Sequence, residues 1–283
     1  MTLLVEPIDV GTMTDFVREH HYSARMPRIT KACMGGFRDG WLVAAVSFGY
    51  GTRPADTPRV MFPSTGVRDY LEIGKMCMTA EEGKRKTLSQ FLSNATRVVR
   101  RQFALKYIFT WADGLWGKVG TIYQASNFLY GGYIWTDVYQ IDGEVVHPRQ
   151  MNGILRENGI ASNKVTPRPT FAELCALGWR HLKGKQFRYV RFLCDERERQ
   201  RLLAESQFDW STNYPKEPDL AWQKHVGKGK WAQCSQPRFI GAKILAVILF
   251  AVLATGTDTH KAVTMWDRIR KWIARNFEPL GSR

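Results

Sequence analysis

Cysteine is scarce in this chain of 283 residues, and none of its five cysteines forms a CxxC pair with another. Their wide spacing excludes a disulfide scaffold and a zinc-ribbon site, and it predicts reduced thiols. A secretion signal is also lacking, since the first residues, MTLLVEPIDVG, contain Glu6 and Asp9 and no basic segment before an apolar core. We therefore expect a cytoplasmic protein.

Acidic residues are few in relation to basic ones. The chain has 26 Asp and Glu residues against 41 Lys and Arg residues, a formal net charge of +15, and the positive charge is spread along the sequence. Cations that neutralise phosphates release bound counterions, which gives affinity for nucleic acid of any sequence. A nucleic acid is thus the expected partner, and a generically basic soluble protein is the alternative.

A long apolar run is confined to residues 239–256, FIGAKILAVILFAVLATG. A membrane-spanning helix needs about 20 apolar residues, whereas this run is shorter and contains Lys243. It favours a buried or partner-binding helix over a membrane span, and residues 260–277 predict a basic amphipathic helix beside it. The change of composition predicts a catalytic domain at residues 1–215 and a C-terminal extension, expected to be helical, at residues 216–283.

The stretch from Phe109 to Gly132, FTWADGLWGKVGTIYQASNFLYGG, predicts a strand, a turn and a helix. The apolar strand ends at Asp113, and apolar residues at helical spacing run from Val119 to Leu129. Ligands of open α/β sheets bind outside the carboxyl ends of the strands, so Asp113 is a candidate catalytic residue. A capping role at the start of the helix explains Asp113 equally well.

The other patterns predict a sheet with flanking helices. A helix capped by Thr12 or Thr14 leads into the cluster His20-His21-Tyr22-Ser23, and Gly74 marks a bulge in a strand at 70–78. Further expected elements are a hairpin turning at Asp39-Gly40, a surface loop at 49–66, a helix at 88–103, a hairpin at 133–140 and 145 onward, a helix over 170–182 with a Thr170–Glu173 capping box, and a strand at 183–193.

A basic turn precedes the helix at 88–103. It reads Gly83-Lys84-Arg85-Lys86, with Ser89 just inside the helix. Free backbone N–H groups and the helix dipole favour an anion at such a place, which makes these residues candidates for binding the phosphates of a donor molecule. A solvated run of charges is the alternative.

This order of elements resembles the acetyltransferase fold of the GNAT superfamily, an α/β (α+β) fold with a central, mostly antiparallel mixed sheet flanked by helices. The strand, bulge, loop and helix from Tyr70 to Phe103 are similar to the acyl-CoA pyrophosphate site of that fold. The usual loop has two or more glycines, whereas this one has Gly83 alone, so the backbone is less open to a pyrophosphate.

Several motifs also follow one another in a distinctive order: HHYS, YLEIGKMCM, the strand ending in ADG, GTIYQASNFLYGG and KGKQFRYVRFL. In these motifs, from about His20 to Leu193, the chain resembles the bacteriophage Mom family of DNA adenine-modifying proteins. The most specific piece is WADGLWGKVGTIYQASNF. The resemblance implies a phage-encoded transferase that converts adenine to N6-carbamoylmethyladenine and so protects phage DNA from host restriction enzymes.

The resemblance implies a site of His21, Tyr22, Lys75, Asp113 and Tyr123, with Ser89 beside it. The family has arginine where this chain has Lys75, and the two residues are not interchangeable in bidentate contacts. Iron has been associated with the family, and its ligands would be His21, Tyr22 and Asp113.

Modification of adenine N6 requires the base to leave the stack. Tyr22, Tyr123 and Trp116 would enclose the base, and Asp113 would accept the N6 proton. The strand at 183–193 interleaves cations with aromatic rings, which suits nucleic acid, while packing of the rings in a core explains the pattern as well. The predicted contacts to double-stranded DNA are Arg25, Arg28, Trp116, Lys118, Lys185, Arg188 and Arg191.

Two donors of the carbamoylmethyl group fit. Acetyl-CoA agrees with the acetyltransferase-like fold but lacks the nitrogen and the oxidation level of the product. Glycyl-tRNA carries both carbons and the nitrogen, and it makes tRNA a second candidate partner. A homodimer is a candidate assembly, whereas a membrane is not an expected partner.

A second class of function is a nucleic-acid-binding or membrane-associated protein that keeps a transferase-like scaffold without catalysis. The two classes differ in where His21, Ser89, Asp113 and Tyr123 lie. These side chains should converge in an enzyme and scatter in a binding protein.

Overall fold

The computed structural model describes residues 3–23, 25–141, 144–146, 148, 154–155 and 168–237. The chain divides into two compact units, the first made of residues 1–114, 118–134 and 186–219 and the second of residues 115–117, 135–185 and 220–283. Among the described residues, no helix combines the length and apolarity that crossing a membrane requires. The predicted tail helices at 239–256 and 260–277 lie outside the described residues.

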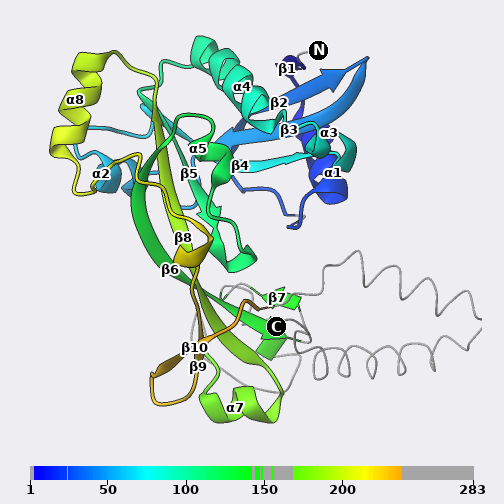
Figure 1. Ribbon diagram of the computed structural model, residues 1–283, viewed down its shortest axis with the longest axis vertical. Helices are drawn as coiled ribbons and strands as arrows, with labels where there is room; N and C mark the ends of the chain where they lie inside the picture. Colours follow the sequence, from blue (N-terminus) through cyan, green and yellow to red (C-terminus); the bar gives the residue numbers. More distant parts are fainter. Residues whose placement is uncertain are drawn as a thin grey trace, which may run out of the picture. The chain divides into compact units, whose positions relative to one another are not determined.

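A mixed sheet forms the centre of the first unit (Figure 1). Its strands neighbour one another in the order β1-β2-β3-β4-β5-β8-β6. Their bounds are β1 Leu4–Pro7, β2 Thr30–Arg38, β3 Trp41–Gly49, β4 Tyr70–Met78, β5 Tyr107–Asp113, β6 Leu129–Ile141 and β8 Arg180–Phe192. The β4–β5 pair is parallel, whereas β1–β2, β2–β3, β3–β4 and β5–β8 are antiparallel. The predicted α/β fold with a mostly antiparallel mixed sheet is confirmed.

The turn between β2 and β3 is the predicted one. Asp39 and Gly40 have φ angles of 51° and 81°, both in the left-handed region that a two-residue hairpin turn requires. Strand β8 likewise covers the predicted 183–193 segment almost completely.

Strand β4 carries the predicted bulge at Gly74. Ser47 of β3 lies opposite Lys75 and Phe48 lies opposite Ile73, so that Gly74 is the extra residue. A Cβ atom at Gly74 would come within 2.4 Å of Pro27 Cγ, which explains why glycine occupies this position. Parallel pairing of β4 with β5 spans only Tyr70–Glu72 and Tyr107–Phe109, and beyond Glu72 the two strands separate.

Two helices cover opposite faces of strands β2 to β4 (Figure 1). Helix α1 (Val10–His20) buries Met13, Phe16 and Val17 in a cluster with Cys33, Ala45 and Cys77. Helix α4 (Leu88–Gln102) packs Phe91 against Gly36 on the other face. Between them in sequence stands the short helix α3 (Ala80–Lys84).

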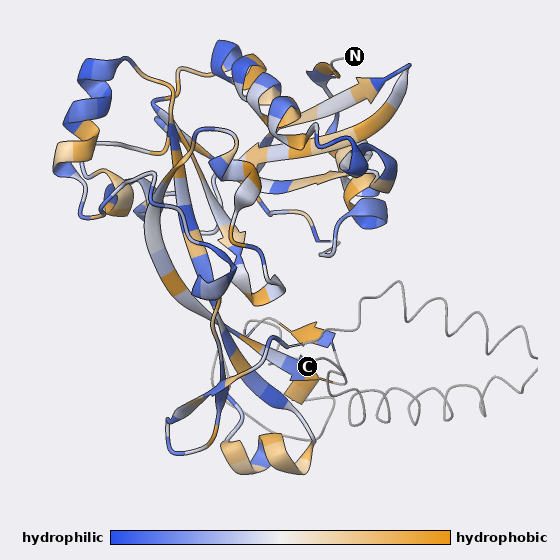
Figure 2. Ribbon diagram, in the orientation of Figure 1, coloured by the Kyte–Doolittle hydropathy of each residue, from blue (hydrophilic) through white to orange (hydrophobic). Residues whose placement is uncertain are grey.

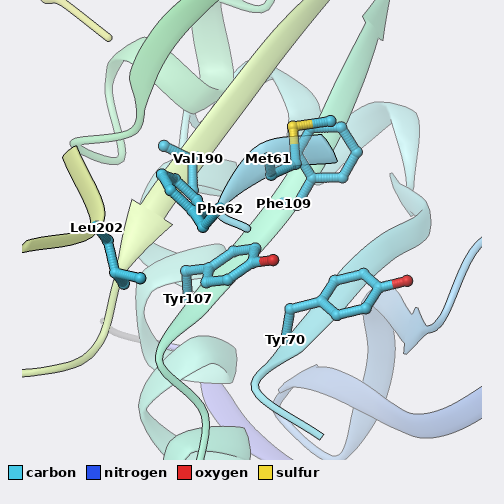
Figure 3. Close-up of a cluster of buried hydrophobic side chains, with 7 residues drawn as sticks. All are labelled: Met61, Phe62, Tyr70, Tyr107, Phe109, Val190 and Leu202. Atoms are coloured by element: carbon cyan, nitrogen blue, oxygen red, sulfur yellow. The ribbon is translucent and has the colours of Figure 1, made fainter. Parts of the chain in front are cut away.

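An aromatic cluster stabilises the side of the unit that holds β5 and β8 (Figure 3). Tyr70 and Tyr107 stack with ring centroids 5.8 Å apart, and Phe62 meets Tyr107 edge-on at 4.8 Å. Short helices α2 (Asp56–Met61) and α8 (Glu196–Glu205) supply Met61 and Leu202 to the same cluster. Helix α8 is hydrophilic in its first turns and hydrophobic towards its end (Figure 2), and Leu202 is its buried residue.

The second unit contains a hairpin, a capped helix and a small sheet. Strand β7 (Glu144–Val146) pairs with the end of β6, as predicted, and β9 (Trp222–His225) pairs with β10 (Trp231–Cys234) and with the start of β8. Helix α7 (Phe171–Ala176) has the predicted Thr170–Glu173 capping box. The hydrophobic core of the second unit includes Tyr139, Leu174 and Trp179.

Local predictions were wrong in four places. The N-cap of α1 is Asp9, which accepts the Thr12 N–H at 2.9 Å, because Asp9 stands directly before the helix. The segment 49–66, expected to be a loop, contains helix α2. The helix expected over 170–182 ends at Ala176, and Leu182 belongs to strand β8. The helix expected after Asp113 shrinks to a 3-10 turn, Gly114–Trp116, and a four-residue helix α5 (Thr121–Gln124). Left-handed backbone at Gly117, Gly120 and Asn127 interrupts it.

Candidate active site

Asp113 is the last residue of β5 and the centre of a polar cluster in the first unit. The Tyr22 hydroxyl donates to Asp113 Oδ2 at 3.4 Å, although 91 residues separate the two in sequence. The backbone carbonyl of Asp113 accepts the Lys118 N–H at 3.2 Å and fixes the turn that follows the strand. Where the capping alternative expected a helix, a 3-10 turn, Gly114–Trp116, follows Asp113. The Asp113 carboxylate itself contacts Tyr22.

The His21–Tyr22 pair follows directly on α1. His21 stacks on Tyr22 with ring centroids 4.2 Å apart, and the Ser23 N–H donates to His21 Nδ1 at 2.9 Å. Burial and the nearby charges of Lys75 and Lys118 lower the pKa of His21 to about 3, so the imidazole is neutral at physiological pH. Burial and the Asp113 carboxylate raise the pKa of Tyr22, which keeps its hydroxyl protonated as a donor.

Two ammonium groups lie beside this pair. Lys118 Nζ lies 4.1 Å from the centre of the Tyr22 ring, and Lys75 Nζ lies 6.0 Å from it. Lys75 Nζ also donates to Ser23 Oγ at 3.0 Å, and its backbone N–H donates to Ser47 Oγ next to the bulge. Loss of water lowers the pKa of both lysines, and attraction to Asp113 opposes that shift. The cluster therefore holds two cations around one carboxylate.

Tyr123 approaches from α5. Its ring lies 5.5 Å from those of Phe128 and Tyr189. Burial raises the pKa of Tyr123, a hydrogen bond with Thr110 opposes that shift, and the charge of Glu72 adds to it. Tyr123 also raises the pKa of Tyr22, so the two phenols and the Asp113 carboxylate share one electrostatic environment. Three of the four residues expected to converge in an enzyme, His21, Asp113 and Tyr123, therefore lie in or beside one cluster, whereas Ser89 lies in the first turn of α4.

Sequence reasoning missed Glu72. This half-buried residue of β4 is the last one to pair with β5. Burial raises the pKa of Glu72 to about 7. A carboxylate inside the apolar strand YLEIG, two residues before a bulge glycine, was the signal that could have revealed it.

The predicted phosphate-binding turn is exposed and structured. Gly83 and Lys84 belong to α3, Lys86 has a left-handed φ of 55°, and Ser89 lies in the first turn of α4. Ser126, close to Tyr123 in sequence, donates its hydroxyl to the Ser89 carbonyl at 3.5 Å. Arg85 forms a 3.6 Å ion pair with the buried Glu82. One cation of the turn is therefore engaged within the protein.

The predicted DNA contacts fall into four groups, of which Lys118, in the cluster around Asp113, is the first. Arg25 and Arg28 are exposed in the segment after Tyr22. Arg188 is 6% exposed, lies 3.8 Å over the Phe208 ring and donates to the Gly131 carbonyl, and Arg191 donates to Ser93 at 3.4 Å. These two arginines are interior cations of the first unit. Trp116 and Lys185 belong to the second unit, where Trp116 packs against Leu115, Val138 and Leu182.

The residues present do not fit an iron site. In the described part of the chain, no three His, Cys, Asp or Glu side chains lie close enough together to hold a metal ion. Burial and the Asp113 carboxylate raise the pKa of Tyr22, which disfavours the phenolate that binds iron, and the ammonium groups of Lys75 and Lys118 lie around the Asp113 carboxylate. A cation at this position would meet like charges, so no step below depends on a metal.

A mixed α/β sheet whose central strands separate beside a cluster of ionisable side chains is typical of an α/β enzyme. The sequence profile described as the Mom protein family matches residues 2–216. The chain belongs to that family, which confirms the resemblance in the sequence motifs. It is 30% identical over 203 residues to methylcarbamoylase mom of Escherichia phage Mu, a match that covers 71% of this chain and 79% of the phage Mu protein.

Acetyltransferases are among the solved structures that show some similarity to this chain. One from Bacillus subtilis, in complex with CoA, is 14% identical, with a TM-score of 0.35 and coverage of 68% of this chain and 100% of the other. YncA from Salmonella typhimurium, with acetyl-CoA, is 9% identical, with a TM-score of 0.37 and coverage of 69% and 96%. At these values the similarity supports no statement about the ligand of this chain.

Proposed function

We propose that this protein is a DNA-modifying transferase that converts adenine to N6-carbamoylmethyladenine in double-stranded phage DNA and thereby protects it from host restriction enzymes. The observation that carries the proposal is the convergence of Tyr22, Lys75 and Asp113 around the end of β5. The name of the phage Mu relative, a methylcarbamoylase, supports the same type of group transfer. A non-catalytic binding protein has no need of such a cluster.

The residues have complementary roles in this reaction. Adenine N6 is a weak nucleophile because its lone pair is delocalised into the ring, so a base and a well-placed acceptor carbon are required. Asp113 accepts the N6 proton, and the Tyr22 hydroxyl, 3.4 Å away, orients the carboxylate. The stacked His21–Tyr22 pair offers an aromatic surface to a flipped base. Lys75 and Lys118 stabilise negative charge that develops on a donor carbonyl.

We infer that the donor is a glycyl ester of tRNA, because its atoms balance without an oxidant. N6 attacks the glycyl carbonyl, the ester bond breaks, and the tRNA hydroxyl leaves with the N6 proton. The freed glycyl amine then attacks adenine C6 through a five-membered ring. As the original C6–N6 bond breaks, N6 becomes the amide nitrogen of the product. Acetyl-CoA needs a nitrogen source and an oxidation of its methyl carbon to reach the same product.

The proposed function is tested by nucleoside analysis of DNA from cells that express the protein. The expected product is a modified deoxyadenosine that co-elutes with authentic N6-carbamoylmethyldeoxyadenosine. N6-glycyldeoxyadenosine has the same mass, so a synthetic standard of each isomer is needed. DNA without either compound would refute catalysis and favour the nucleic-acid-binding alternative.

Isotopic labelling separates the donors. Purified protein is given DNA with glycyl-tRNA carrying nitrogen-15 glycine, or with carbon-labelled acetyl-CoA. We expect label from glycine only, and we expect nitrogen-15 on the nitrogen bonded to adenine C6, because the rearrangement exchanges the two nitrogens. Carbon label from acetyl-CoA would refute the tRNA donor. Nitrogen-15 in the amide would still support glycyl-tRNA as the donor, but it would refute the rearrangement.

DNA binding is expected to depend steeply on salt, because the net charge of +15 favours many phosphate contacts. Affinity should fall by roughly 10³-fold between about 50 and 200 mM salt. Arg25→Ser with Arg28→Ser, two exposed residues beside Tyr22, should lower the slope of log affinity against log salt by about 2. Titration of a fluorescent duplex measures both effects.

The matched control removes the same charge elsewhere. Arg100 and Arg101 are exposed in the last turn of α4, next to the start of β5, whereas Asp113 stands at the other end of that strand. Arg100→Ser with Arg101→Ser should change the slope less. A flat salt response of the unmodified protein would contradict a phosphate-binding surface.

A further inference from the structure

Glu72 occupies a special position in the sheet. It forms the last pair between β4 and β5, opposite Phe109, and two residues later the bulge at Gly74 turns the strand. Its carboxylate lies against the backbone of Gly51, where a Cβ atom would come within 2.0 Å of Glu72 Oε2. Gly51 has a φ of 65°, so a side chain is disfavoured there on two grounds. The fold thus keeps room for this carboxylate at the point where the strands separate.

Within the described part of the chain, no hydrogen bond or ion pair engages the Glu72 carboxylate, and loss of water alone perturbs it. The titratable groups that face it are phenols, Tyr70 on its own strand and Tyr123 on α5. Lys75 and Lys118, the cations of the site, interact with Asp113 instead. A carboxylate removed from water without a cation costs free energy in the folded state.

A ligand with a positive charge would remove this cost. The glycyl ester of the proposed donor carries one, since an α-amino group has a pKa of about 8 and is largely protonated at neutral pH. An acetyl group carries none. The amine must also lose its proton before it can attack C6, so the group that binds the ammonium is well placed to remove that proton.

We propose that Glu72 is the binding site and proton acceptor for the ammonium group of an aminoacyl donor. This inference rests on the proposed function and assigns the donor subsite within it. Glu72 first pairs with the ammonium and orients the glycyl unit. After acyl transfer it takes one proton from the ammonium, and the free amine forms its bond to C6. The proton returns to N6 as the C6–N6 bond breaks, which regenerates the carboxylate and leaves the amide as NH2. The nitrogen newly bonded to C6 releases its second proton to solvent and becomes the neutral secondary amine of the product.

The acid–base character of Glu72 suits this exchange. Burial raises the pKa of Glu72 to about 7, close to that of an α-amino group. Proton transfer between groups of similar pKa is nearly balanced in free energy, and both directions are accessible at neutral pH. Asp113, with two ammonium groups near it, performs the first proton transfer from N6.

The test compares donors and a variant. Binding of glycyl-tRNA and of N-acetylglycyl-tRNA, in which an acetyl group on the nitrogen removes the positive charge, is measured on the full chain with DNA. We expect the wild-type protein to bind glycyl-tRNA about 10-fold more tightly. Glu72→Gln should lose this discrimination, bind N-acetylglycyl-tRNA as before, and accumulate N6-glycyldeoxyadenosine in place of the rearranged product.

Controls separate this proposal from the proposed function. Glu6→Gln changes an exposed carboxylate on β1 and should behave as wild type. Glu72→Gln removes a charge that has no partner in the described part of the chain, and the variant should melt no lower than wild type at pH 8. Equal binding of the two tRNAs by the wild-type protein, or normal product from Glu72→Gln, would overturn the role of Glu72 while the modification itself stands. Absence of modified adenine with the wild-type protein would instead overturn the proposed function.

Discussion

Replacement of Asp113 by asparagine is expected to lower adenine modification by about 10²- to 10⁴-fold, the usual contribution of a positioned general base. Asparagine has nearly the same shape and can still accept the hydrogen bond that Tyr22 donates to Oδ2, but it cannot take up the N6 proton. The backbone contact of Asp113 with Lys118 is independent of the side chain, so the turn after β5 should persist. Nucleoside mass spectrometry of plasmid DNA measures the loss.

The control for Asp113→Asn is Asp15→Asn, which neutralises an exposed carboxylate on α1 whose partner is Arg18. Circular dichroism and the melting temperature should match wild type for both variants. Near-normal levels of modified adenine in Asp113→Asn would reduce Asp113 to a residue that only orders the turn. A fall in the melting temperature that accompanies the loss of activity would also argue for a structural role.

The largest effect on stability is expected from Glu82→Ala. Glu82 is 2% exposed and receives two hydrogen bonds from Arg38, at 2.8 and 2.7 Å, and one from Thr87 at 2.5 Å. Removal of the Glu82 carboxylate takes away the ion pair and both of its hydrogen bonds with the Arg38 guanidinium, itself 15% exposed. Removal of one member of a buried pair costs about 3 to 5 kcal/mol. Urea unfolding at pH 7 should show a loss of about 3 kcal/mol or more with an unchanged m-value.

The pH dependence of the same pair has a defined sign. Hydrogen bonds from Arg38 lower the pKa of Glu82 to about 2 in the folded protein, below the ordinary value of 4.5. The stabilisation is therefore complete above about pH 4.5 and is lost as the pH falls towards 2. Wild type and Glu82→Ala should converge in stability over that interval. A pair of apolar replacements, Arg38→Met with Glu82→Leu, should recover much of the loss at pH 7.

A small effect of Glu82→Ala, below about 1 kcal/mol, would mean that the pair is solvated and that α3 is held in other ways. The outcome also bears on the donor turn, because Glu82 contacts both Arg85 and Thr87, the residue before α4. If the basic turn binds the donor, the variant should raise the KM for the donor as well.

The sequence by itself determined the features that depend on neighbouring residues. Asp39-Gly40 specified a hairpin because few residues adopt two successive left-handed φ angles, and Thr170 with Glu173 specified a helix start. Gly74 marked a bulge, since glycine inside a strand weakens it unless the backbone departs from regular pairing. Linear motifs also indicated the family, and the family profile matches residues 2–216.

Only the tertiary structure decided which of these segments meet. Tyr22 reaches Asp113 across 91 residues because α1 packs on β2, β3 and β4 and ends beside the bulge, a result of sheet register and helix packing that no local pattern encodes. The same register buried Arg188 among aromatic rings, where a pattern of alternating cations had suggested a DNA surface. It also left Glu72 without a partner among the described residues, where β4 and β5 separate. Burial and charge at one point depend on every strand around it, so the role of a side chain there follows from the assembled sheet.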